Sequence, residues 1–263
     1  MSDLKNNQIK KTLVIKRKMG GEMWELMLNN LIPILTANEK ELLYFIEKRA
    51  RDKDLPVLTD PDNYFYIHKA DNNICLVAHI DTYFSQKPKN KDIIRNGYEL
   101  TTNGIGLGAD DRAGVYILLE FISDPNYNLL FTNYEETGRQ GIRKALQEEK
   151  ICTLLSKNTC FIELDRKGHK NFVYYTKPEE EFIRIFKEFG WREEEGTSSD
   201  IKDISKALGI ASVNLAVGFY NAHIPNEYLN LAHLADTIDL LKNESLVKKL
   251  KERQYKDYEG KAV

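Results

Sequence analysis

The chain has 263 residues, and its 38 lysines and arginines against 40 aspartates and glutamates give a formal net charge of −2. Hydrophobic residues make up 42% and charged residues 30%, which is the composition of a folded globular protein and not of a disordered one. The near-neutral charge argues against a protein that binds nucleic acid by bulk electrostatics. No apolar run approaches the ~20 residues of a membrane span, so we expect no membrane association.

Two features bear on the cellular compartment. The three cysteines, Cys75, Cys152 and Cys160, are an odd number without the paired spacing of a metal site. The first residues lack the apolar stretch of a secretory signal. Free cysteines suit a reducing compartment, so we expect a cytoplasmic protein.

The chain opens with a basic segment, and residues 1–25 are interpreted as an N-terminal arm. Within it, residues 10–18 have an apolar centre, which fits an edge strand, an arm packed on a partner or a solvated tail. Thr36 and Glu39 have the spacing of a capping box and predict the start of a helix.

From residue 63 onward, strand-like and helix-like patterns alternate along the chain. The predicted strands cover 63–69, 73–81, 98–102, 127–134, 159–165, 171–176 and 210–218. The predicted helices cover 112–122, 141–155, 179–189 and 230–251, the last with a break near 243–245. This order predicts an α/β fold: a three-layer α/β/α sandwich around a mixed, mostly parallel sheet. With no repeat, linker or shift in composition, residues 1–263 are expected to form a single domain.

Acidic and histidine side chains follow five of these segments. In open α/β sheets ligands bind at the carboxyl ends of the strands, so the five segments are expected to meet in one crevice. Carboxylates with imidazoles are the ligand set of zinc, manganese or cobalt. The residues concerned are His79, Asp81, Asp110, Asp111, Glu135, Glu136, Asp165 and His223.

Each segment also has an ordinary structural interpretation. A single histidine at a strand end is more often a hydrogen-bonded polar residue than a ligand. Asp110 and Asp111 stand where helix N-termini favour acids, and Glu135 and Glu136 suit a solvated loop. The complete ordered set, more than any one member, favours a site.

The segments LVAHIDT, GIGLGADDRAG, FTNYEETGRQG, FIELDRKG and VGFYNAHIPNE together resemble the motifs of the di-zinc aminopeptidase and carboxypeptidase clan, which includes leucyl aminopeptidases and peptidase T. The resemblance runs from about Asn73 to Asp239. The peptidase T branch carries an inserted lid or dimerisation domain, for which the intervals between these motifs are too short. The domain organisation is therefore similar to that of the single-domain aminopeptidase branch, although the sequences GADDRAG and NAHIPNE are more similar to those of peptidase T.

The resemblance implies a role for each residue of the set. His79 and Asp165 would bind one metal ion, Glu136 and His223 a second, and Asp110 would bridge the two. Asp81 would orient the His79 ring, and Glu135 would be the general base that activates a water held between the ions. The resemblance also implies a cis peptide bond between Asp110 and Asp111, and a supporting role for Glu227 in the loop near His223.

The implied activity is that of a di-metal exopeptidase, an aminopeptidase on short peptides that uses two divalent ions: zinc, with manganese or cobalt as alternatives. The same site would also serve a hydrolase of N-acyl amino acids or other amides. A non-catalytic binding domain of the same fold is a third interpretation, which the intact ligand set and Glu135 disfavour. The sequence indicates no oligomeric state.

Two further residues are candidates for substrate binding. Tyr220 would orient a substrate carbonyl, with a packed aromatic ring as the alternative. Arg166 would hold a substrate carboxylate, with a structural ion pair as the alternative. The remaining histidines, His68, His169 and His233, match no motif and are expected to be structural or solvent-facing.

Overall fold

The computed structural model describes residues 21–175, 180–196 and 198–252. Its main sheet has eight strands in the order β1-β2-β6-β3-β7-β10-β8-β9. The pairings β6–β3, β3–β7, β7–β10 and β8–β9 are parallel, and the other three are antiparallel. The predicted mixed, mostly parallel sheet is therefore confirmed.

The strands of the main sheet are β1 (Val57–Asp60), β2 (Tyr64–Ile67), β3 (Ile74–His79), β6 (Tyr127–Thr132), β7 (Cys160–Arg166), β8 (Asn171–Val173), β9 (Arg192–Glu193) and β10 (Ser212–Ala216). A smaller sheet consists of β4 (Ile93–Asn96), β5 (Glu99–Thr102), β11 (Phe219–Tyr220) and β12 (Tyr228–Asn230). The helices are one described over residues 21–36, α2 (Glu39–Arg51), α3 (Ala109–Glu120), α4 (Gln140–Gln147), α5 (Glu149–Leu155), α6 (Glu180–Glu188), α7 (Asp200–Leu208), α8 (Leu231–Leu241) and α9 (Glu244–Glu252), with a 3₁₀ turn η1 (Asn90–Asp92).

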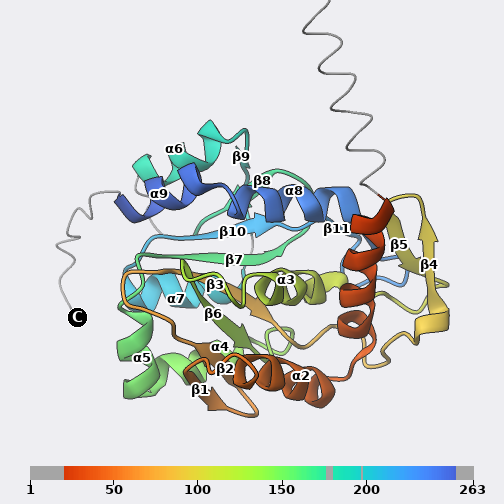
Figure 1. The fold of residues 1–263 in the computed structure, drawn as a ribbon, viewed down its shortest axis with the longest axis horizontal. Helices are drawn as coiled ribbons and strands as arrows, with labels where there is room; N and C mark the ends of the chain where they lie inside the picture. Colours follow the sequence, from red (N-terminus) through yellow and green to blue (C-terminus); the bar gives the residue numbers. More distant parts are fainter. Residues whose placement is uncertain (1–20, 176–179, 197, 253–263) are drawn as a thin grey trace, which may run out of the picture.

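Helices cover both faces of the main sheet (Figure 1). Successive residues of a strand point to opposite faces, and β3 shows this directly. Leu76 packs into the core that contains α2, α3, α6, α8 and α9, whereas Val77 packs against α4, α5 and α7. The expected three-layer sandwich is confirmed, and the described residues between the motifs contain no separate lid domain.

The small sheet and the N-terminal helix lie side by side at one end of the molecule (Figure 1). Trp24 of the helix meets Tyr98 edge to face, with ring centroids 5.2 Å apart. Arg95 Nη1 lies 2.9 Å from Glu25 Oε1. Only one strand of this sheet was predicted, because two- to four-residue strands carry too few positions to show alternation.

Three predictions about local structure are corrected. The predicted basic arm overlaps residues 21–25, which are helical; residues 1–20, including the apolar centre at 10–18, lie outside the described part. The capping box is formed by Asn38 and Glu41. Thr36 instead donates to the Ile32 carbonyl and ends the preceding helix. The predicted helix over 141–155 is two helices, because Glu148 adopts an extended conformation.

No disulfide bond joins Cys75, Cys152 or Cys160, and Cys75 and Cys160 are buried. Within the described ranges, no helix combines the length and the apolar character needed to cross a bilayer.

Candidate metal centre

His79 stands at the carboxyl end of β3, only 2% exposed. Its Nδ1 lies 3.0 Å from the Asp81 carbonyl oxygen and 3.2 Å from Asp81 Oδ1. This places the ring proton on Nδ1 and leaves Nε2 free to act as a ligand. Nε2 faces Asp110 Oδ1 at 3.3 Å and Asp165 Oδ1 at 3.6 Å.

His223 forms a second group around the other oxygen of Asp110. Its Nε2 lies 3.2 Å from Asp110 Oδ2 and 3.1 Å from Glu136 Oε1. The residue has a positive φ of 66°, and its ring stacks on Tyr83 with centroids 4.7 Å apart. The loop between β11 and β12 thus turns this half-exposed imidazole back toward the sheet.

The donor set fits two divalent metal ions. The ligand atoms of His79, Asp110 and Asp165 lie within 4.8 Å of one another, and so do those of Asp110, Glu136 and His223. Donors that bind zinc at ~2.0–2.2 Å in a tetrahedron are about 3.4 Å apart, close to the separations seen here. Asp110 offers one oxygen to each group, which is the arrangement of a bridging carboxylate.

The electrostatics of the site favour cations. Burial raises the pKa of Asp165, and the neighbouring Asp110 charge raises it further. Burial also raises the pKa of Glu136 to about 7. For Asp110, burial opposes ionisation, but hydrogen bonds from His223 and His79 outweigh it and lower the pKa. Carboxylates that are crowded and desolvated in this way are stabilised by a bound cation.

Asp81 connects the His79 ring to the two glutamates after β6. Its Oδ1 accepts the Glu135 N–H and its Oδ2 the Glu136 N–H, both at 3.1 Å. Burial raises the pKa of the half-buried Glu135, the charges of Asp110 and Asp81 add to the shift, and His79 opposes it. Glu135 is therefore near enough to His79, Asp81 and Asp110 for their charges to act on it, and it belongs to neither ligand group.

The fully buried Glu227 holds the loop that carries Asp110 through hydrogen bonds to the loop's main chain. Its carboxylate accepts N–H bonds from Leu107, Gly108 and Asp110. Glu227 was expected to support the loop near His223, and its carboxylate instead holds the loop that carries Asp110. The peptide bond between Asp110 and Asp111 is cis, as the resemblance implied.

Asn214 is a residue of this site that the sequence reasoning missed. β7 contains an extra residue relative to β10, since Glu163 pairs with Asn214 but Arg166 pairs with Ala216. This bulge removes Asp165 from the strand ladder and directs it into the site. The Asn214 side chain replaces the lost pairing: Oδ1 accepts the Asp165 N–H at 3.0 Å, and Nδ2 donates to the Asp165 carbonyl at 3.1 Å. The available signal was a single amide inside the apolar run IASVNLAVG.

We predict that Asn214→Ala weakens binding of one of two metal ions by about 10–100-fold, because groups that orient a metal ligand have effects of that size. Calorimetric titration with Zn²⁺ measures both affinities. Ser212→Ala, a buried polar change on the same strand, is the control. Unchanged affinity in Asn214→Ala would show that Asp165 needs no such support.

The two residues predicted to bind substrate, Arg166 and Tyr220, both contact other side chains of the protein. Arg166 donates to Asn171 Oδ1 at 2.6 Å and Glu194 Oε2 at 2.7 Å, which is the ion-pair alternative. The Tyr220 hydroxyl oxygen and His233 Nδ1 share a hydrogen bond of 2.8 Å, and the Tyr220 ring stacks on Tyr228. Neither contact tests a role in substrate binding, so both roles stay predictions.

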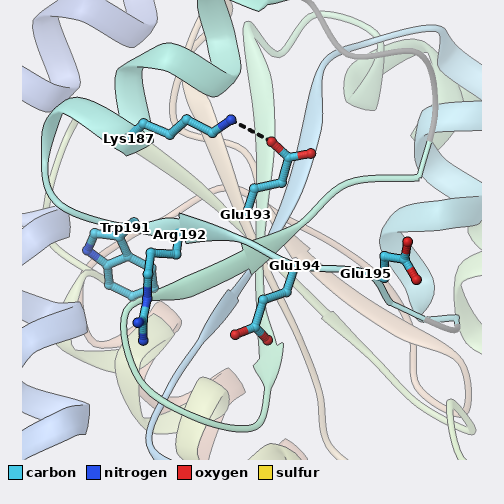
Figure 2. A pocket seen from close by; sticks show the side chains of 6 residues that line it. All are labelled: Lys187, Trp191, Arg192, Glu193, Glu194 and Glu195. Carbon is cyan, nitrogen blue, oxygen red and sulfur yellow. Dashed lines mark ion pairs between the residues drawn. The ribbon is translucent and has the colours of Figure 1, made fainter.

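Glu194 also lines a surface groove of about 430 Å³ beside Trp191, shown in Figure 2. There Lys187 Nζ pairs with Glu193 Oε2 at 2.6 Å. The groove contains no residue of the five motifs, so it is separate from the candidate metal centre.

The fold is shared with solved peptidase structures. An aminopeptidase PepT from Bacillus cereus matches with a TM-score of 0.68 and 15% identity over 87% of this chain and 99% of that one. A tripeptidase from Staphylococcus aureus matches with a TM-score of 0.65 and 14% identity over 86% and 98%. An aminopeptidase from Desulfurococcus kamchatkensis matches with a TM-score of 0.61 and 11% identity over 88% and 99%. No protein-family model and no curated protein sequence matches this chain.

These likenesses define the class to which the fold belongs. The architecture predicted from the five motifs is that of the aminopeptidase and tripeptidase structures, which confirms the resemblance at the level of the fold. At identities of 15% and below, the activity has to be argued from the site.

Proposed function

We propose that this protein is a di-metal exopeptidase that removes amino-terminal residues from short peptides. The observation that carries the proposal is the pair of ligand groups that share Asp110, with Glu135 near His79 and Asp110. The names of the neighbouring structures, an aminopeptidase and a tripeptidase, support the same assignment. We also propose zinc as the metal, with manganese or cobalt as alternatives, and a cytoplasmic location, which fits three cysteines that form no disulfide bond.

Each residue of the site would have a separate role. His79 and Asp165 would hold one ion, Glu136 and His223 the other, and Asp110 both. When bound, the two ions lower the pKa of a shared water and polarise the scissile carbonyl. Glu135 would take the proton from the attacking water and deliver it to the leaving amine, as a carboxylate outside both ligand groups can. Asp81 keeps the His79 proton on Nδ1 throughout.

The N-acyl amino acid hydrolase remains the alternative substrate class, since the same residues would serve it. A mixed pool of free-amine and N-acetylated short peptides, incubated with Zn²⁺, Mn²⁺ or Co²⁺ and analysed by mass spectrometry, separates the two. We expect ladders that shorten from the free amino terminus. Release of the acetyl group alone would select the alternative. A protein that binds no metal and cleaves no member of the pool would support the non-catalytic domain.

A further inference from the structure

A cavity of about 680 Å³ opens next to the metal centre, within the ~300–1,000 Å³ of ligand sites. Asp81 and Glu136 form its inner end. Its outer walls come from the first turns of α2, the turn between β1 and β2, and the loops that follow β3 and β6, the last of which lies within one of the five motifs. The walls away from the metal ligands include Leu43, Pro61, Tyr83 and Tyr134.

The α2 wall is fixed to the catalytic core through Glu39. Arg112, fully buried on α3, donates to the Ile34 and Ala37 carbonyls at 2.9 and 3.0 Å, and its Nη2 lies 3.6 Å from Glu39 Oε1. Lys87 Nζ pairs with the same Glu39 oxygen at 2.8 Å and donates to Thr82 Oγ1 at 2.7 Å. The α2 wall is therefore tied both to α3 and to the loop that follows β3.

The charges around the cavity do not favour a charged occupant. Glu39 is compensated by Lys87 and Arg112. The remaining outer charges, Lys40 and Asp62, are opposite in sign. The uncharged part of the lining consists of the apolar surfaces of Leu43 and Pro61, the half-exposed rings of Tyr83 and Tyr134, and the polar side chains of Asn38, Thr82, Asn133 and Thr137.

We propose that this cavity receives the side chain of the peptide's amino-terminal residue and that it selects large, uncharged, apolar or aromatic side chains. The proposal rests on the exopeptidase function above. Leu43 is the residue that sets the size of the cavity, because it projects from α2 into the wall and belongs to no motif. Selectivity of this enzyme is thus encoded in a helix that precedes all its metal ligands in the sequence.

The test is a change of size at Leu43. Leu43→Trp is expected to lower kcat/KM for Leu-Gly-Gly and Phe-Gly-Gly by about 10–100-fold relative to Ala-Gly-Gly, the range that one poorly fitting apolar group produces. Leu43→Ala is expected to shift preference from leucine toward tryptophan at the amino terminus. This enlarging variant gives an answer even if the bulkier one fails to fold. Tyr44→Trp is the control, since Tyr44 is the next residue, is 67% exposed and lines none of the cavity.

Binding measured without turnover separates this inference from the proposed function. In the Glu135→Gln background, calorimetry with the same tripeptides should show the same order of affinities. If the unaltered enzyme cleaves the peptides but the Leu43 variants keep its Leu-to-Ala ratio, the cavity assignment is overturned and the peptidase remains. A changed preference only at the second residue of the peptide would also overturn it. If the unaltered protein neither binds nor cleaves any of these peptides, the proposed function itself fails.

Discussion

Glu135→Gln is expected to lower kcat by about 10²–10⁴-fold, the usual contribution of a general acid–base residue. The amide has nearly the same shape as the carboxylate but cannot accept the water proton. The Glu135 main-chain N–H that reaches Asp81 is retained, so His79 and the glutamate loop should keep their positions. Fold and metal content are therefore expected to stay unchanged.

Peptide cleavage rates and metal content by mass spectrometry, measured on the same protein sample, check this prediction. Glu149→Gln on α5 is the control for removing one negative charge away from the site. Full activity in Glu135→Gln would mean that another group takes the proton. Loss of metal together with activity would assign Glu135 to the ligand set instead.

Arg112→Met is expected to lower the free energy of unfolding by roughly 2–5 kcal/mol. The substitution leaves the Ile34 and Ala37 carbonyls without their donor, and each buried unsatisfied group costs about 1–3 kcal/mol. Urea unfolding followed by circular dichroism measures the change.

Arg143→Met gives the matched comparison, because Arg143 is half exposed and pairs with Asp203 at 3.1 Å. An exposed pair of this kind contributes about 0–1 kcal/mol. Equal destabilisation by the two substitutions would mean that the buried arginine does not hold the N-terminal helices to the core.

Much of the sheet could be predicted because its strands are long, apolar and separated by helical patterns. Ile74–His79 and Tyr127–Thr132 are buried along their whole length and stood out as continuous apolar runs. The grouping of the acidic residues followed from the same rule, since Asp81, Glu135 and Asp165 lie at the ends of neighbouring parallel strands. Position along a strand thus carried most of the information about the site.

The residues that sequence reasoning missed act through tertiary contacts. In the sequence, Arg112 resembles any charged residue in the first turn of a helix. Only the fold brings its side chain to the Ile34 and Ala37 carbonyls, at the junction of two helices 75 or more positions earlier in the chain. Asn214 matters because of an extra residue in the adjacent strand β7, which no local pattern in β10 reveals. The wall at Leu43 was likewise invisible, because its partners Pro61 and Tyr134 are distant in sequence.

The attachment of the N-terminal helices has a consequence for how the protein is made. During synthesis the helix pair over residues 21–51 leaves the ribosome about sixty residues before Arg112, the side chain that anchors it. The partners Lys87, Arg95 and Tyr98 are also translated after the pair, and the anchor at Arg112 exists only once α3 has been translated. We expect the growing chain to carry this amphipathic pair undocked, as a surface that chaperones would recognise. The cavity wall at Leu43 would be completed only after the pair has docked.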